Sequence, residues 1–147
     1  MPADTPYFDT CYLVRLYLED AGFEVVRDLA GESHTVVSAW HARTELIAAL
    51  HRVFREHRLS RGAFQAALAQ FVADSQSGLF DWLPLTEGVH QRVLQVFRKA
   101  PATAFLRSAD ALHLACAAEH GFETIYSNDR HLLAAAPLFG LNGVNIL

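Results

Sequence analysis

Residues 106–133 constrain the fold of this chain more than any other stretch, because they carry in order the signals for a helix, a strand and a second helix. Asp110 lies in the first turn after an expected cap at Ser108, where the backbone amides and the helix dipole favour an anion. Gly121 ends this helix, and β-prone residues follow it as a short strand. The strand leads into a polar turn at Asp129. Both acids are therefore expected at the same edge of a parallel sheet.

Apolar segments alternate with amphipathic helical segments along the whole chain. Strands are expected at 7–8, 35–38, 80–85, 122–126 and 144–146, and helices at 11–19, 23–30, 39–56, 60–74, after Thr86, after Ser108 and at 130–136. Ser38 is the expected cap of helix 39–56. This alternation predicts an α/β fold, a three-layer α/β/α sandwich with a mostly parallel sheet. The 147 residues are 52% hydrophobic, which is enough for the core of a single domain covering 1–147.

Targeting and membrane signals are missing from the sequence. Residues 1–4 lack the basic and apolar regions of a signal peptide. No stretch approaches the roughly 18 uninterrupted apolar residues that a membrane-spanning helix needs. Cys11 and Cys116 lie in expected helices, outside any metal-binding or redox spacing. These features predict a cytoplasmic protein with reduced thiols and no membrane association.

Four carboxylates are expected where the carboxyl ends of the parallel strands meet, and these are Asp9, Glu45, Asp110 and Asp129. Each has an ordinary role when taken alone, as a helix cap, a partner of a helix dipole or a surface acid. Acids that gather without matching bases repel one another, and a cation usually neutralises them. Because the donors are all oxygens, Mg²⁺ or Mn²⁺ is expected rather than zinc. Thr10 and Ser127 are expected to hydrogen-bond these carboxylates or simply to form turns.

Basic residues gather in two groups, although a net charge of −4 argues against a uniformly basic nucleic-acid binder. The first group contains Arg52, Arg55, Arg58 and Arg61 with His51 and His57, and the second contains Arg92, Arg98, Lys99 and Arg107. Arginine grips phosphate better than lysine does, but solvated helix faces explain the same pattern. None of the histidines has a zinc-binding spacing. For His113, one turn beyond Asp110, packing or a helix-end hydrogen bond is expected.

Four segments carry the acids, and they are Phe8-Asp9-Thr10, Thr44-Glu45-Leu46, Ser108-Ala-Asp110-Ala-Leu-His-Leu-Ala115 and Tyr126-Ser-Asn-Asp129-Arg-His-Leu132. In order and spacing they resemble the PIN-domain family and, more narrowly, the VapC-type toxins of toxin–antitoxin pairs. The resemblance runs from about Tyr7 to the C-terminus. It implies an endoribonuclease that cleaves single-stranded RNA, depends on Mg²⁺ or Mn²⁺ and leaves 5′-phosphate products. It departs mildly at Cys11, where a serine or similar small residue is common, and at Ser127, where threonine is usual.

The resemblance also implies roles for individual residues and partners. The family's acidic positions carry over to Asp9, Glu45, Asp110 and Asp129. Asp9 and Asp110 are expected to bind the metal directly, and Glu45 and Asp129 to complete the site directly or through water. Arg52, Arg55, Arg107 and Arg130 are candidate contacts to the RNA backbone. We expect a cognate antitoxin to block the site of this type II toxin, and the chain to form a homodimer.

Two other classes of function stay open. An aspartyl phosphotransfer enzyme of the haloacid-dehalogenase type needs a second aspartate two residues after the first, where this chain has Cys11. A receiver domain needs a lysine late in the chain, and the only lysine, Lys99, precedes Asp110. The second class is a catalytically inactive PIN-like binding module. Four retained acids argue against it, and an activity assay decides.

Overall fold

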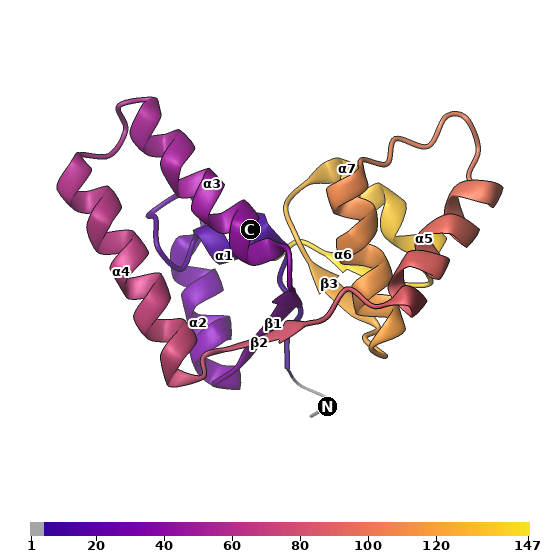
Figure 1. Ribbon diagram of the computed structural model, residues 1–147, viewed down its shortest axis with the longest axis horizontal. Coiled ribbons are helices and arrows are strands. Elements are labelled where there is room, and N and C mark those ends of the chain that lie inside the picture. Colours follow the sequence, from indigo (N-terminus) through magenta and orange to yellow (C-terminus); the bar gives the residue numbers. More distant parts are fainter. Residues whose placement is uncertain (1–4) are drawn as a thin grey trace.

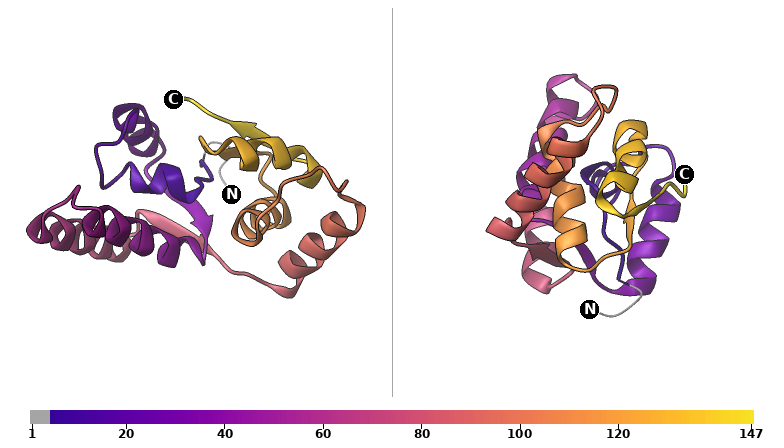
Figure 2. Two further views of the ribbon diagram at one scale, coloured as in Figure 1. Left: turned by 90° about the horizontal axis from the view of Figure 1, so that it is seen from above. Right: turned by 90° about the vertical axis from the view of Figure 1, so that its right-hand side faces the viewer.

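The computed structural model describes residues 5–147 and places helices on both sides of a set of parallel strands (Figure 1; Figure 2). The expected three-layer α/β/α arrangement is confirmed. Residues 1–4, over which the sequence indicates no signal peptide, lie outside the described residues. Among the helices of residues 5–147, none is long and apolar enough to cross a membrane.

The helices and strands follow one another along the chain in alternating groups. Their bounds are α1 (Thr10–Val14), α2 (Phe23–Ser33), β1 (Val36–Ala39), α3 (Ala42–Arg55), α4 (Arg61–Ser77), β2 (Phe80–Leu83), α5 (Glu87–Lys99), α6 (Ser108–Glu119), β3 (Thr124–Tyr126), α7 (Arg130–Ala135), the 3₁₀ helix η1 (Ala136–Phe139) and β4 (Asn142–Val144). Figure 1 shows α1–α4 on one side of the strands and α5–α7 on the other.

The N-terminal segment forms the middle of the sheet. β1 pairs with β2 and β3 pairs with β4, both in parallel. Between these pairs, Tyr7 bridges to Val37 and Phe8 bridges to Tyr126. The order is therefore β2, β1, residues 7–8, β3 and β4. The expected first strand is present only as these two bridges, which leave Asp9 at the carboxyl end of the sheet's centre.

Two clusters of buried side chains stabilise the fold, one on each side of the central segment. Successive residues of an extended chain point to opposite faces, so neighbours can serve different clusters. Tyr7 packs in the cluster that includes Leu114 and Ile125, and Phe8 packs in the one that includes Tyr12 and Leu46. These are fully buried side chains. Residues 7–8 are thus anchored from both sides, which holds the backbone of Asp9 in place.

The start of α3 differs from the sequence prediction. Ser38 does not cap this helix, because it lies fully buried in β1 and its hydroxyl donates a 2.7 Å hydrogen bond to the carbonyl oxygen of Phe8. The helix begins after His41, which makes no side-chain cap hydrogen bond. The strand therefore continues through the position where the sequence indicated a helix start.

Other boundaries move by a few residues. Arg107, rather than Ser108, is the N-cap residue of α6. β4 ends at Val144, where the predicted strand was to begin. α4 continues through the expected loop to Ser77 and ends at Gly78, whose φ of 86° is favourable for glycine. By contrast, Thr86 caps α5 as predicted, through a hydrogen bond from the backbone N–H of Val89.

Candidate active site

Asp9 lies at the carboxyl end of the central segment and is only 6% exposed. Its backbone N–H donates to the carbonyl oxygen of Tyr126 at 3.0 Å, which ties it to the end of β3. One carboxylate oxygen, Oδ1, accepts the backbone N–H of Thr10 at 2.7 Å and so caps α1. The other, Oδ2, accepts the hydroxyl of Ser127 at 2.8 Å. Asp9 is therefore both a helix cap and part of a larger polar cluster.

Ser127 connects Asp9 to Asp129. It follows β3 directly, is fully buried, and its Oγ also accepts the backbone N–H of Asp129 at 3.0 Å. Asp129 is the N-cap of α7, and its Oδ1 accepts the backbone N–H groups of His131 and Leu132 at 2.8 and 3.3 Å. The short turn after β3 thus carries both a cap for α7 and a hydrogen-bond donor to Asp9.

Arg107 links the two remaining aspartates of the cluster. Its Nε lies 3.0 Å from Oδ2 of Asp110, and its Nη2 lies 2.6 Å from Oδ2 of Asp129. Asp110 is in the first turn of α6 and is 9% exposed, whereas the side chain of Arg107 is 54% exposed. A solvent-exposed guanidinium therefore balances the charge of two acids that lie near each other.

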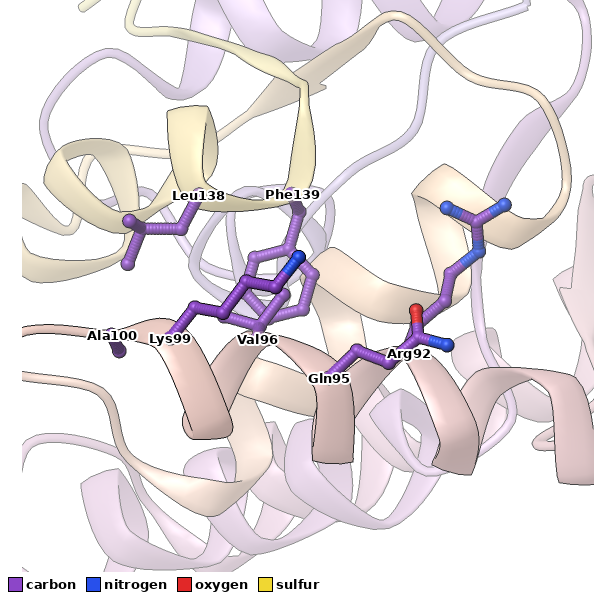
Figure 3. A pocket seen from close by; sticks show the side chains of 7 residues that line it. All are labelled: Arg92, Gln95, Val96, Lys99, Ala100, Leu138 and Phe139. Atoms are coloured by element: carbon purple, nitrogen blue, oxygen red, sulfur yellow. The ribbon is translucent and has the colours of Figure 1, made fainter.

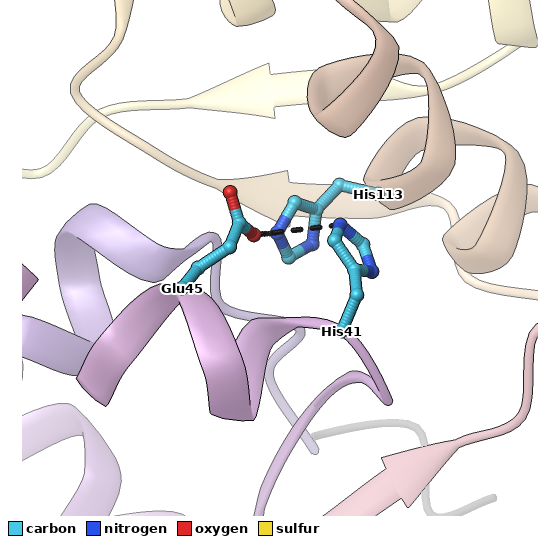
Figure 4. Close-up of side chains that lie close together, drawn as sticks. All are labelled: His41, Glu45 and His113. Carbon is cyan, nitrogen blue, oxygen red and sulfur yellow. Dashed lines mark hydrogen bonds and ion pairs between the residues drawn. The ribbon is translucent and has the colours of Figure 1, made fainter. Parts of the chain in front are cut away.

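Glu45 lies in the first turn of α3 and reaches the cluster through Thr10 and His113. Its Oε1 accepts the hydroxyl of Thr10 at 2.9 Å and lies 2.7 Å from Nε2 of His113 (Figure 4). The same His113 nitrogen is 3.6 Å from Oδ1 of Asp9. The structure thus brings together all four acids singled out in the sequence, joined by Thr10, His113, Ser127 and Arg107.

His113 has a larger role than the sequence suggested. It is fully buried, and its Nδ1 lies 2.9 Å from the hydroxyl of Tyr7, so the imidazole is held at both nitrogens. Its position three residues after Asp110 placed it on the same helix face as that acid. That spacing was the available signal. The partner, Glu45, is 68 residues away, and only the fold shows the pairing.

The site contains a second histidine, His41, which sequence reasoning did not single out. It precedes α3, and its Nε2 lies 3.2 Å from the carbonyl oxygen of Ala109 and 3.4 Å from Oε1 of Glu45. Its ring packs on that of His113 with centroids 4.3 Å apart. Its Nδ1 is buried and has no hydrogen-bond partner among residues 5–147. The i, i+4 spacing of His41 and Glu45 was the signal in the sequence.

Burial and the neighbouring charges act differently on the aspartates. Burial raises the pKa of Asp110, and the negative charges of Asp9 and Asp129 add to this, while Arg107 opposes it; the pKa stays above its ordinary value. Burial would also raise the pKa of Asp129, but two backbone N–H groups of α7 and Arg107 outweigh it and hold that pKa below its ordinary value. Of these two acids, Asp110 therefore has the less well compensated charge.

Glu45 and His113 form a partly buried pair in which each residue shifts the pKa of the other. Burial alone would raise the pKa of Glu45, but the hydrogen bond and charge of His113 lower it overall. Burial alone would lower the pKa of His113, but Glu45 and Asp9 raise it overall. In His41 burial and the nearby His113 lower the pKa. The ionised carboxylate and the protonated imidazole thus stabilise each other.

A groove with a volume of about 580 Å³ runs from Glu45 along α3. It is lined by Thr10, Cys11, Val14, Glu45, Ala48, Ala49, His51, Arg52 and Arg55. Arg52 and Arg55 are among the residues that the sequence indicated as RNA contacts. The groove therefore combines a carboxylate end with an arginine end.

A second cavity, of about 250 Å³, lies away from the acids between α5 and η1 (Figure 3). It is lined by Arg92, Gln95, Val96, Lys99, Ala100, Leu138 and Phe139. The second basic group of the sequence is therefore divided, since Arg92 and Lys99 line this cavity whereas Arg107 reaches the acids.

An exposed aromatic side chain lies beside Arg107. Phe105 is 56% exposed, and its ring packs on that of His131 with centroids 4.3 Å apart. The guanidinium of Arg107 is 5.9 Å from the centre of the same ring. Sequence reasoning did not single out Phe105, because an isolated phenylalanine before a helix carries no periodic signal. The structure places a flat apolar surface next to the cation that contacts Asp110 and Asp129.

The acids are suited to a hard divalent cation. They supply only oxygen donors, and in the metal-free protein their charge is offset by an exposed arginine, which water or a metal can replace. His41, Glu45 and His113 form a different donor set, with one atom from each lying within 4.8 Å of the others. The residues present therefore fit a divalent ion that prefers oxygen ligands.

Comparison with known proteins adds a family and a fold. The sequence model of the PIN domain matches residues 7–137. Among solved structures, the chain is similar in fold to VapC20 of Mycobacterium tuberculosis, described as a sarcin–ricin loop cleaving toxin, with a TM-score of 0.67. The two are 20% identical, and the match covers 89% of this chain and 95% of that one. None of the curated proteins compared with the chain matches it significantly.

Proposed function

This chain belongs to the PIN-domain family, and from that premise we propose that it is a metal-dependent endoribonuclease that hydrolyses RNA phosphodiester bonds. The observation that carries the proposal is the convergence of Asp9, Asp110, Asp129 and Glu45 at one edge of the sheet, with Arg107 bridging two of them. The guanidinium of Arg107 lies against two of these acids, and the same negative charges would attract a metal ion.

Each acid has a defined task in this proposal. Asp9 and Asp110 would hold the ion directly, and Glu45 and Asp129 would complete its coordination directly or through water. Bound Mg²⁺ or Mn²⁺ would supply charge for the phosphate oxygens and lower the pKa of a water molecule for in-line attack. Glu45 or Asp129 would orient the attacking water or accept its proton. Ser127 and Thr10 hold the carboxylates in position by the hydrogen bonds described above.

The surroundings of the acids support single-stranded RNA as the substrate. Arg52 and Arg55 line the groove that begins at Glu45, and they can follow a phosphate backbone. Phe105 offers a face on which a base can stack, a contact that every nucleobase can make. Arg130 is exposed at the start of α7 and is available for a further phosphate contact. Stacking surfaces and arginines beside one acidic site favour a nucleic acid over a smaller phosphate ester.

We further propose that the protein is the toxin of a type II toxin–antitoxin pair, a cytoplasmic homodimer whose antitoxin blocks the site. The fold it shares with VapC20, itself a toxin, supports this role. The contacts of Arg107 with Asp110 and Asp129 show that a guanidinium fits against these acids. A basic side chain of the antitoxin would bind there for the same electrostatic reason.

The deciding experiment measures cleavage of labelled RNA by the purified protein with Mg²⁺, with Mn²⁺ and with EDTA. We expect cleavage with either ion, none with EDTA, and a loss of several orders of magnitude in Asp9→Asn and Asp110→Asn. A preparation of Asp110→Asn serves as the control for contaminating nuclease. Cleavage that persists in excess EDTA would exclude the metal mechanism, and RNA binding without cleavage under all conditions would favour the inactive binding module.

Co-purification tests the partner separately from the chemistry. The product of a small neighbouring reading frame, expressed with this chain, is expected to form a complex in which cleavage is suppressed. Free nuclease activity in a stoichiometric complex would contradict the role of an inhibitory antitoxin.

A further inference from the structure

Two histidines and a glutamate form a set of metal donors that differs in kind from the four acids. His41, Glu45 and His113 come from the start of α3 and from α6 and point toward one another (Figure 4). We propose that they bind a borderline-soft divalent ion such as Zn²⁺, and that this ion inhibits the protein by withdrawing Glu45 from the carboxylate site. The inhibition rests on the proposed nuclease function, whereas the binding does not.

The donor atoms of the three residues lie within 4.8 Å of one another, and two of their distances can be compared with those of a zinc site. Zinc bonds of about 2.0–2.2 Å place neighbouring ligands of a tetrahedral site roughly 3.4 Å apart. Oε1 of Glu45 is 3.4 Å from Nε2 of His41, which already matches. It is 2.7 Å from Nε2 of His113, so this pair has to open by a fraction of an ångström when an ion replaces the shared proton. The side chain of Glu45 is 32% exposed and can make that movement.

The buried histidine is held in an orientation that suits a ligand. A metal-binding histidine usually has its second ring nitrogen hydrogen-bonded to another group, which orients the ring. Nδ1 of His113 has such a partner in the hydroxyl of Tyr7, at 2.9 Å. A tyrosine hydroxyl both donates and accepts, so it serves the imidazole with or without an ion on Nε2. Tyr7 is fully buried, so this orientation is maintained by the core.

An oxygen is available as a fourth ligand. Oγ1 of Thr10 lies 3.3 Å from Nε2 of His113 and is not among the proposed Mg²⁺ ligands. His41 has to give up its contact with the carbonyl oxygen of Ala109 to join the ion. Its side chain is 16% exposed, so the ion can approach from the side of His41 and Glu45.

The types of ligand atom determine which ion, Zn²⁺ or Mg²⁺, each site prefers. Imidazole nitrogens bind Zn²⁺ and its neighbours in the transition series, whereas Mg²⁺ binds oxygens in octahedral geometry. Mg²⁺ is therefore expected at the aspartates and Zn²⁺ at the histidines. Glu45 is common to both sets, and its Oε1 is the atom that faces both histidines. A zinc ion on Oε1 holds this carboxylate at the histidines and takes up part of its charge, which weakens its contribution to the proposed catalytic centre.

Calorimetric titration of the full-length, metal-free protein with ZnCl₂, in excess Mg²⁺, tests the binding. We expect one equivalent of Zn²⁺ to bind the wild type, and at least tenfold weaker binding in His41→Ala and in His113→Gln. His90→Ala, which changes an exposed histidine of α5, is the matched control and is expected to bind like the wild type. Cobalt(II) absorption gives a second readout, since nitrogen ligation in a tetrahedral site produces intense visible bands. Because His113→Gln alters the core, its folding is checked by circular dichroism. If His113→Gln is unfolded, the zinc affinity of His41→Ala decides the test.

The inhibition is measured as the ZnCl₂ concentration that halves each protein's own rate of RNA cleavage in Mg²⁺. That concentration is expected to match the calorimetric affinity in the wild type and to rise at least tenfold in His41→Ala. Equal zinc affinity in wild type and His41→Ala overturns the proposal, as does binding that disappears only in Asp110→Asn. If the protein binds zinc as expected but never cleaves RNA, the proposed function fails while the metal site stands.

Discussion

The hydroxyl of Ser127 donates a 2.8 Å hydrogen bond to Oδ2 of Asp9, although the two residues are 118 positions apart in the sequence. Both side chains are buried, so the bond is shielded from water. It joins the end of the central segment to the turn after β3, and through the backbone of Asp129 it reaches the start of α7. One hydroxyl thus sets the position of two acids of the site.

Ser127→Ala is expected to destabilise the protein by about 1–3 kcal/mol, because it removes the hydroxyl that donates to Oδ2 of Asp9 and accepts the backbone N–H of Asp129. Ser127→Thr keeps the hydroxyl and is expected to restore most of that stability. Urea unfolding of the three metal-free proteins, monitored by circular dichroism, gives the free energies of unfolding. A threonine variant as unstable as the alanine variant would show that the volume at this position matters more than the hydrogen bond.

Mg²⁺ is expected to raise the melting temperature of the wild type, because an ion that binds only the folded state stabilises it by about 2.7 kcal/mol at one hundred times its dissociation constant. The rise is expected to shrink in Asp9→Asn and Asp110→Asn. Asparagine caps a helix about as well as aspartate, so Asp9→Asn keeps its cap of α1. Its metal-free form is therefore expected to be as stable as the wild type or more stable, since one crowded charge is gone.

Thermal unfolding with EDTA and with millimolar Mg²⁺ provides the measurement for these proteins. Glu56→Gln is the control, because it removes an exposed acid that pairs with Arg58 at the surface. The same metal-induced rise in all four proteins would mean that Asp9 and Asp110 are not ligands.

The sequence predicted the strand ends and helix starts that carry Asp9, Asp110 and Asp129 to within a few residues. Their positions follow from short-range periodicity and from the shared edge of parallel strands. Ser38 shows where such reasoning fails. A serine between an apolar run and a helix has the pattern of an N-cap, but its hydroxyl donates to Phe8, 30 residues away. Nothing local distinguishes a cap from a buried strand serine.

The histidines show the same limit within the site. His113 was expected to pack or to meet a helix end, and it does pack, but its hydrogen bonds go to Tyr7 and Glu45. These partners are 106 and 68 residues away. Helical spacing places His113 on the face of Asp110, and only the fold, which brings the start of α3 close to α6, places Glu45 next to it. Contacts between elements that are distant in the sequence determine the electrostatics of the site. Local sequence patterns do not predict these contacts.

Arg107→Ala is expected to strengthen Mg²⁺ and Mn²⁺ binding, because the guanidinium competes with a metal ion for Asp110 and Asp129. The variant's stability is expected to fall by less than about 1 kcal/mol, since ion pairs of an exposed arginine contribute little. Calorimetric titration of the metal-free proteins with MnCl₂ compares the affinities. Arg58→Ala serves as the control, since its ion pair with Glu56 lies on the surface. Weaker Mn²⁺ binding in Arg107→Ala than in the wild type would contradict competition.

The Glu45–His113 pair is expected to make the metal-free protein's stability depend on pH. The pKa of His113 is raised, so its contribution is fully present below the ordinary histidine value of 6.5 and is lost as the pH rises through the raised pKa. The pKa of Glu45 is lowered, so its contribution is present above the ordinary value of 4.5 and is lost as the pH falls through the lowered pKa. The pair is therefore most stabilising between these two ordinary values.

Urea unfolding of wild type and Glu45→Gln in EDTA at about pH 5.5 and about pH 9 measures this dependence. The loss of stability caused by Glu45→Gln is expected to be larger at the lower pH. A loss that is equal at both values would show that His113 does not carry a proton in this pair.

Phe105→Ala is expected to raise the KM for single-stranded RNA severalfold to a hundredfold, with a smaller effect on kcat, because stacking of one base on an aromatic ring is worth about 1–3 kcal/mol. Phe105→Tyr keeps a stacking face and is expected to have the wild-type KM. Phe105→Leu is apolar but not aromatic, and its KM is expected to stay raised. Phe97→Ala, which removes a 45% exposed phenylalanine of α5, controls for the loss of surface aromatic area. Steady-state cleavage of a short labelled RNA gives KM and kcat for each protein. If leucine restored the KM as well as tyrosine does, the side chain would act by apolar packing rather than by stacking. An unchanged KM combined with weaker inhibition by the antitoxin would assign Phe105 to the protein partner instead of the RNA.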